Sequence, residues 1–126
     1  MNNTNKFSVR KQLRSFKYAF NGIKLLIKTE HNMQIHVVAA ITAILLSLLL
    51  HISCTEWCMV FLAIALVMSC EGVNTVIEKI TDKIYPEYSE QAKFIKDVAA
   101  GAVLISAIGA LIIGLIIFLP KIINLL

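Results

Sequence analysis

Residues 98–120 read VAAGAVLISAIGALIIGLIIFLP, a run of 23 residues without one charged side chain. About 20 consecutive apolar residues in a helix are enough to cross the hydrocarbon core of a bilayer. This stretch therefore predicts a membrane-spanning helix, and it sets the fold class of the whole chain.

Two further apolar runs precede this segment, and neither 33–50 nor 57–70 contains Asp, Glu, Lys or Arg. Residues His51–Glu56 between them are expected to form a short exposed turn. Three helical spans are therefore predicted, at about 33–51, 57–78 and 98–120.

The composition agrees with a membrane protein. Apolar residues make up 58% of the chain and its mean hydropathy is +0.77, more than a soluble domain can cover with polar side chains. The prediction is a single all-α domain over residues 1–126. Small residues recur at every fourth position in two spans, so the spans are expected to pack tightly; these residues are Ala39, Ala43 and Ser47, and Ala102, Ser106, Ala110 and Gly114.

An amphipathic surface helix is predicted at about 7–29, before the first span. Its apolar residues are spaced alternately by four and three, which places them on one helical face beside a row of cations. Such a helix suits the headgroup plane of a membrane. The apolar face consists of Val9, Leu13, Phe16, Phe20, Ile23 and Ile27.

The distribution of positive charge predicts the orientation. Seven Lys and Arg lie before the first span, four between the second and third, and Lys121 alone after the third. By the positive-inside rule the N-terminus faces the cytoplasm, where no cleavage of a leader is expected. A chain this apolar offers no soluble basic surface for nucleic acid, so lipid headgroups and nucleotide phosphates are the expected partners.

The polar residues that could carry chemistry follow the second apolar run. Glu71, Asn74 and Glu78 fall on one helical face, and Asp82 extends the row by one turn. Carboxylates at the edge of hydrocarbon are costly unless a cation, a proton path or water satisfies them. Mg²⁺ takes one or two protein carboxylates, so Glu78 is a candidate ligand. Glu30 could supply the second from another helix, or could be a solvated helix end.

The pair Lys96-Asp97 lies just before the third span, at the same predicted depth. A lysine there could stabilise phosphate charge, although such pairs are also common topological anchors. The chain has neither a P-loop nor a dinucleotide-binding glycine motif. The three histidines are scattered and are interpreted as interfacial or packing residues: His31, His36 and His51.

The pattern as a whole resembles the prokaryotic integral-membrane lipid kinases, the diacylglycerol kinase and undecaprenol kinase family. The resemblance rests on E-x-x-N-x-x-x-E-x-x-x-D at 71–82 and AKFIKDVAAGAV at 92–103. SFKYAFNG at 15–22 and EHNMQIH at 30–36 also fit the family. The resemblance covers essentially the whole chain. It implies a homotrimer whose active sites combine residues from neighbouring subunits.

The resemblance also implies a role for each site residue. Glu71 matches the catalytic base, and Glu30 and Glu78 match the carboxylates that hold Mg²⁺ with the co-substrate ATP. The remaining positions match groups around the nucleotide, the phosphates and the reacting hydroxyl: Lys11, Arg14, Asn74, Asp82, Lys96 and Asp97.

The expected activity is transfer of the γ-phosphoryl group of ATP to a membrane lipid alcohol, at the cytoplasmic face of the bacterial inner membrane. The amino-acid sequence at 30–36 and 96–101 resembles the undecaprenol kinase branch more than the enterobacterial diacylglycerol kinases. The residues alone also leave open a small proton-coupled transporter, with a protonatable carboxylate in the membrane. A third alternative is a non-catalytic assembly subunit whose polar row joins helices through hydrogen bonds.

Overall fold

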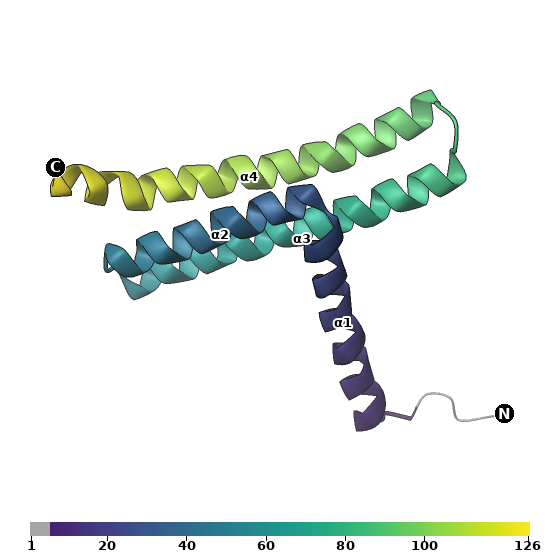
Figure 1. Cartoon of the computed structure of the whole chain (residues 1–126), viewed down its shortest axis with the longest axis horizontal. Coiled ribbons are helices and arrows are strands. Elements are labelled where there is room, and N and C mark those ends of the chain that lie inside the picture. The colour runs from purple at the N-terminus through teal and green to yellow at the C-terminus, as the bar shows by residue number, and fades with distance from the viewer. Residues whose placement is uncertain (1–5) are drawn as a thin grey trace.

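The computed structural model describes residues 6–126, which form four α-helices and no strand (Figure 1). Three of these helices are long and apolar enough to cross a membrane. The predicted class, an all-α membrane protein with one amphipathic helix and three spans, is confirmed. The four helices are α1 (Val9–Thr29), α2 (His31–Leu49), α3 (Cys54–Ile84) and α4 (Glu90–Leu125).

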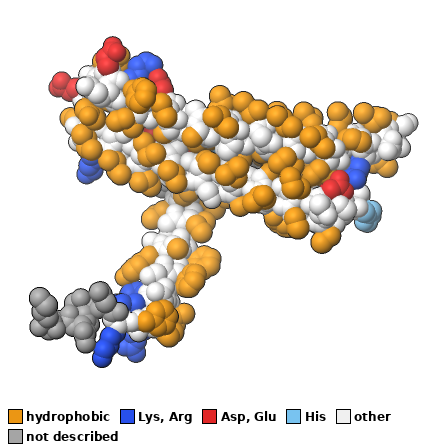
Figure 2. All heavy atoms as spheres, turned by 180° about the vertical axis from the view of Figure 1, so that it is seen from behind, with side chains coloured by type: hydrophobic (Ala, Val, Ile, Leu, Met, Phe, Trp, Pro, Cys, Tyr) orange, Lys and Arg blue, Asp and Glu red, His pale blue; other side chains and the backbone are white. Residues whose placement is uncertain are grey.

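Helices α2, α3 and α4 run side by side, whereas α1 leaves this bundle crosswise (Figure 1). No residue of α1 is buried, and its apolar residues Leu13, Phe16 and Phe20 are all exposed. Apolar side chains cover the middle of the bundle, and charged ones gather at its two ends and near the free end of α1 (Figure 2). With the spans along the membrane normal, α1 is placed to lie in the headgroup plane.

The turn between α2 and α3 is shorter than the predicted exposed turn. Helix α3 begins at Cys54, because the Ser53 hydroxyl accepts a hydrogen bond from the Glu56 backbone and the Glu56 carboxylate accepts one from the Ser53 backbone. Such a reciprocal capping box fixes a helix start. Ile52 is also buried rather than exposed. His51 has a φ of 49°, the left-handed conformation that reverses the chain here.

Helices α3 and α4 continue beyond the spans expected from the apolar runs. With 31 and 36 residues they are about 46 Å and 54 Å long at 1.5 Å per residue, whereas the hydrocarbon core is about 30 Å thick. Their connected ends extend past the start of α2 (Figure 1). A core of this thickness cannot cover either helix completely, so part of each lies outside the hydrocarbon.

The opposite end of the bundle holds the apolar core. Ile52, Val60, Ile117 and Phe118 form one buried cluster. Beside it the Lys121 ammonium lies 3.3 Å from the Glu56 carboxylate, which joins the last turns of α4 to the start of α3. Packing and this ion pair hold this end together, and the candidate catalytic residues lie toward the other end.

Candidate active site

Glu71 is the most deeply buried charged residue of the described chain, with 2% of its surface exposed. It lies on the face of α3 that packs against α2, where the His36 Nε2 atom approaches its Oε2 atom to 3.4 Å. The prediction from the sequence had treated His36 as a packing or interfacial residue. In the structure His36 lies three residues after Met33, which is 1% exposed and marks the inward face of α2, and no pattern within the apolar run indicated this face beforehand.

One turn further along α3, Asn74 is 5% exposed and has an unsatisfied acceptor. Its Nδ2 donates to Glu78 Oε1 over 3.4 Å, but its Oδ1 has no hydrogen-bond partner among residues 6–126. Unlike the Asn74 oxygen, the buried hydroxyls nearby have hydrogen-bond partners. Thr75 and Thr81 donate to backbone carbonyls one turn earlier, at 3.0 Å and 2.7 Å. An orphaned buried acceptor is unusual and points to a missing ligand or ion.

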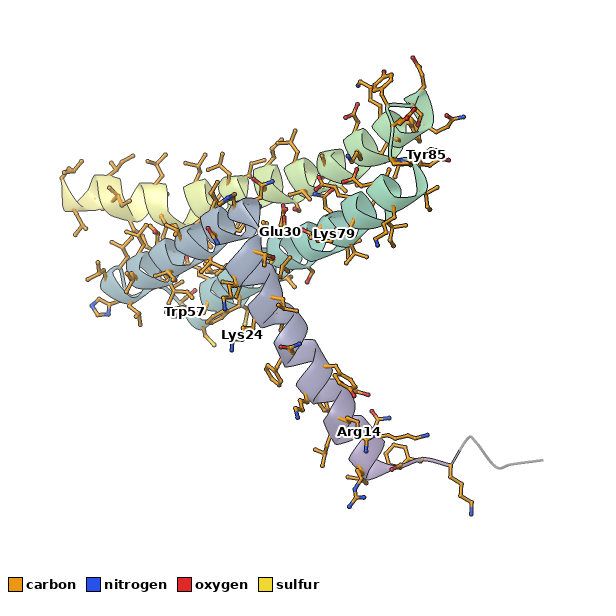
Figure 3. All side chains as sticks on the ribbon, turned by 45° about the vertical axis from the view of Figure 1, so that its right-hand side comes forward. Arg14, Lys24, Glu30, Trp57, Lys79 and Tyr85 are labelled. Atoms are coloured by element: carbon orange, nitrogen blue, oxygen red, sulfur yellow. The ribbon has the colours of Figure 1, made fainter. Side chains whose placement is uncertain are left out.

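Glu30 forms the corner between α1 and α2, where an extended backbone (φ −102°, ψ 116°) ends one helix and begins the next. Its carboxylate lies 3.8 Å from the Lys79 ammonium of α3 (Figure 3). Because Lys79 directly follows Glu78, this contact brings the corner to the same turn of α3 that carries the predicted magnesium ligand. Lys79 had not been predicted as part of the site.

A second group of charges joins α3 to α4. The Lys96 ammonium contacts the Asp82 carboxylate directly and also lies within Coulombic range of Glu78. Asp97 instead contacts Lys93, four residues earlier on the same helix. The site therefore has a cation from α4 beside the carboxylates of α3, as phosphate chemistry requires.

Lys11 and Arg14 are not brought to this group within one chain. Arg14 lies far along α1 from Glu30 (Figure 3), and their separation of 16 positions corresponds to roughly 24 Å of helix. Both side chains are exposed, and neither makes an ion pair within residues 6–126. If they contact a nucleotide, it is not at the Glu71 site of their own subunit.

The donor set suits Mg²⁺, although no group of three or more His, Cys, Asp or Glu side chains is placed to hold a metal within residues 6–126. Magnesium needs only one or two protein carboxylates, because water and phosphate oxygens complete its shell. The half-buried Glu78 carboxylate and the orphaned Asn74 Oδ1 are hard oxygen ligands on adjacent turns. Glu30, held near the same turn, is the second available carboxylate.

An apolar groove of about 560 Å³ runs between α2, α3 and α4. His36 lies in its wall, so the groove adjoins the Glu71 contact. Four of the seven small residues that predicted tight packing line this groove, namely Ala39, Ala43, Ala110 and Gly114. Helices α2 and α4 touch only slightly, so these small residues do not pack the two helices closely against each other.

Comparisons with known proteins give one family for the chain. The model of the family described as prokaryotic diacylglycerol kinase matches residues 17–118. The undecaprenol kinase of Bacillus subtilis (strain 168) is 43% identical over 108 residues, which cover 86% of this chain and 88% of that protein. A diacylglycerol kinase of Synechocystis sp. is 37% identical over 113 residues, 89% of this chain and 65% of that protein. The diacylglycerol kinase of Escherichia coli (strain K12) is 29% identical over 111 residues, 88% of this chain and 89% of that protein.

Proposed function

The chain belongs to the prokaryotic diacylglycerol kinase family, and on that premise we propose that it transfers the γ-phosphoryl group of ATP, with Mg²⁺, to a membrane lipid alcohol. Family membership makes it a lipid kinase, a phosphotransferase with an alcohol acceptor, in a bacterial membrane. It thereby favours the kinase over the transporter and the assembly subunit. The donor, the metal, the acceptor lipid and the residue roles are the proposal.

The observation that carries the proposal is a buried carboxylate in contact with a histidine that lines an apolar groove. Glu71 is 2% exposed, and its neighbour His36 lines the groove of about 560 Å³, whose other walls are mostly apolar. A lipid alcohol in the groove would bring its hydroxyl to the polar end. Glu71 then takes the hydroxyl proton while the lipid oxygen attacks the γ-phosphorus and the bond to the ADP oxygen breaks.

The neighbouring residues act on the phosphates. Glu78 and Glu30 would hold Mg²⁺ together with ATP, and the bound ion would neutralise charge on the phosphate oxygens. Asn74 would offer its unpaired Oδ1 as a further oxygen ligand at the same turn. Lys96 supplies positive charge from α4, and Asp82 holds it in place. Asp97 is proposed as a further polar group near the phosphates and does not depend on its exposed pair with Lys93. All these groups lie where the bundle leaves the hydrocarbon, so ATP arrives from water and the alcohol from lipid.

We propose undecaprenol as the preferred acceptor and the cytoplasmic face of the inner membrane as the location of the site. Identity to the undecaprenol kinase is 43%, against 37% and 29% for the two diacylglycerol kinases, which supports the first point. The concentration of Lys and Arg on one side supports the second. A homotrimer would let Lys11 and Arg14 of one subunit reach a neighbour's nucleotide, since they lie too far from their own Glu71.

The test is transfer of labelled γ-phosphate from ATP to undecaprenol and to diacylglycerol, presented side by side in mixed micelles with and without Mg²⁺. Glu71→Gln keeps the size of the buried side chain but removes the base, and is expected to reduce transfer by about 10²- to 10⁴-fold. Glu90→Gln, at the exposed start of α4, is the matched control and should retain full activity. No transfer to either lipid by well-folded wild-type protein would contradict the proposal, and a higher rate with diacylglycerol would reverse the substrate preference.

A further inference from the structure

We infer that His36 is a positioning residue that holds the Glu71 carboxylate in the orientation needed for proton abstraction, an inference that rests on the proposed kinase function. The two side chains come from different helices and are 35 positions apart, yet His36 Nε2 and Glu71 Oε2 are 3.4 Å apart. A small rotation of either group brings this contact to ordinary hydrogen-bonding distance.

Among the side chains around Glu71, His36 is the one placed to orient the carboxylate. The carboxylate is nearly inaccessible, and within residues 6–126 no other cationic side chain lies within 4 Å of it. Thr75, the nearest buried hydroxyl along α3, donates to the Glu71 backbone carbonyl rather than to its side chain. A buried carboxylate with a single side-chain partner is oriented by that partner, because losing the contact leaves a buried acceptor unsatisfied.

The histidine itself is held in place by its helix. Met33 and Ser47 lie on the inward face of α2 and are 1% and 0% exposed, so this face of the helix cannot turn away from α3. His36 is one turn from Met33 on the same side. An imidazole fixed in this way donates to one oxygen of Glu71 and leaves the other free to accept the proton of the lipid hydroxyl.

The contact between His36 and Glu71 can also be reached from the groove. His36 lines the groove of about 560 Å³, and its side chain is 19% exposed rather than sealed. Removing the imidazole therefore leaves a space that is open to the groove and large enough for a free imidazole molecule. This access makes chemical rescue a fair test of the role.

The experiment compares His36→Ala, His36→Gln and the control His31→Ala, whose side chain is exposed at the start of α2. Labelled phosphate transfer is measured with each lipid, with and without added imidazole. For His36→Ala we expect kcat to fall by about 10- to 100-fold, the usual cost of a slightly misplaced catalytic group. The KM for ATP should stay within about two-fold, because the contact of His36 is with Glu71 and not with the residues assigned to Mg²⁺ and the phosphates. His36→Gln keeps an N–H donor and should retain more activity, and imidazole should restore part of the kcat of His36→Ala alone.

The outcomes separate this inference from the proposed function. Lack of transfer by the wild type would remove the kinase proposal itself. An active wild type with unchanged kcat in His36→Ala would overturn the positioning role. So would a loss that neither glutamine nor imidazole reduces, because a purely structural histidine predicts that pattern. If His36→Ala fails to assemble, kcat and the KM for ATP of His36→Gln decide between the two, since a positioning defect lowers kcat alone.

Discussion

Replacement of Asn74 by leucine should make the ligand-free protein more stable and nearly inactive. Asn74 is 5% exposed, and its Oδ1 atom has no partner within residues 6–126. Leucine has nearly the same shape, so it fills the same space without a buried acceptor. The substitution therefore separates the cost of keeping this amide in the bundle from its use in the reaction.

The expected magnitude follows from two opposing contributions. A buried polar group without a partner costs about 1–3 kcal/mol, which leucine recovers. The hydrogen bond from Asn74 to Glu78 is lost, but at 3.4 Å it is long and contributes only about 0.5–1 kcal/mol. The net gain is about 1 kcal/mol, or roughly 4 °C in melting temperature for a chain of this size.

Activity should change in the opposite direction. Removing one polar group that acts on transferring phosphate oxygens typically costs about 10²- to 10³-fold in kcat. Melting temperature in detergent without ATP or Mg²⁺, and labelled phosphate transfer in micelles, are measured on the same preparation. Asn32→Leu is the control, because Asn32 is exposed near the same corner and should change neither quantity appreciably.

A less stable Asn74→Leu protein with near-normal kcat would refute the reasoning, because it would show that Asn74 is a satisfied structural residue. A loss of both stability and activity would also count against it, since the orphaned oxygen would then have a partner in the assembled protein. Only a more stable and inactive variant agrees with an amide retained for its chemistry.

Three further substitutions test other parts of the site in the same assays. Lys96→Gln should lower kcat by about 10- to 100-fold, because it removes the cation beside the carboxylates of α3. The control Lys93→Gln breaks only an exposed pair within α4 and should keep kcat within about two-fold of the wild type. Similar losses in the two variants would contradict this assignment. Gly72→Ala places a new Cβ 3.2 Å from Leu26 at the end of α1 and should lower activity several-fold, while Gly109→Ala meets no atom within 4 Å and should not; full activity in Gly72→Ala would show that the position of α1 is unimportant. Glu56→Gln breaks the ion pair with α4 at the far end, so we expect a melting temperature lower by a few degrees with unchanged kcat, and a fall in kcat would link the two ends.

The helices could be predicted from the sequence because their signals are local. A charge-free run of 23 residues predicts a span whatever surrounds it, and the spacing of apolar residues along 7–29 predicts the surface helix. The helix ends were less predictable. Polar residues at the connected ends of α3 and α4 look like loops by hydropathy, yet both helices continue through them. Ser53 caps α3 at Cys54, ahead of its apolar run, and Ser89 caps α4 at Glu90, ahead of the run that begins at Val98.

The site could be predicted only along single helices. The spacing of Glu71, Asn74 and Glu78 placed them on one face, and this face is buried or half-buried as expected. Contacts between helices depend on the rotation of each helix about its axis, which periodicity within one segment does not determine. The contacts Glu71–His36, Glu30–Lys79 and Asp82–Lys96 all join different helices, and sequence reasoning had identified neither His36 nor Lys79.

The depth of Glu71 connects the fold to the kind of reaction. Glu71 lies 17 residues after the start of α3 at Cys54, which corresponds to about 26 Å along the helix. In a hydrocarbon core of about 30 Å this places the carboxylate close to the far boundary rather than at the midplane. A transporter needs its binding carboxylate near the middle, because the group must be reached from both sides in turn. A lipid kinase needs the opposite arrangement, since its two substrates meet only where hydrocarbon ends and water begins.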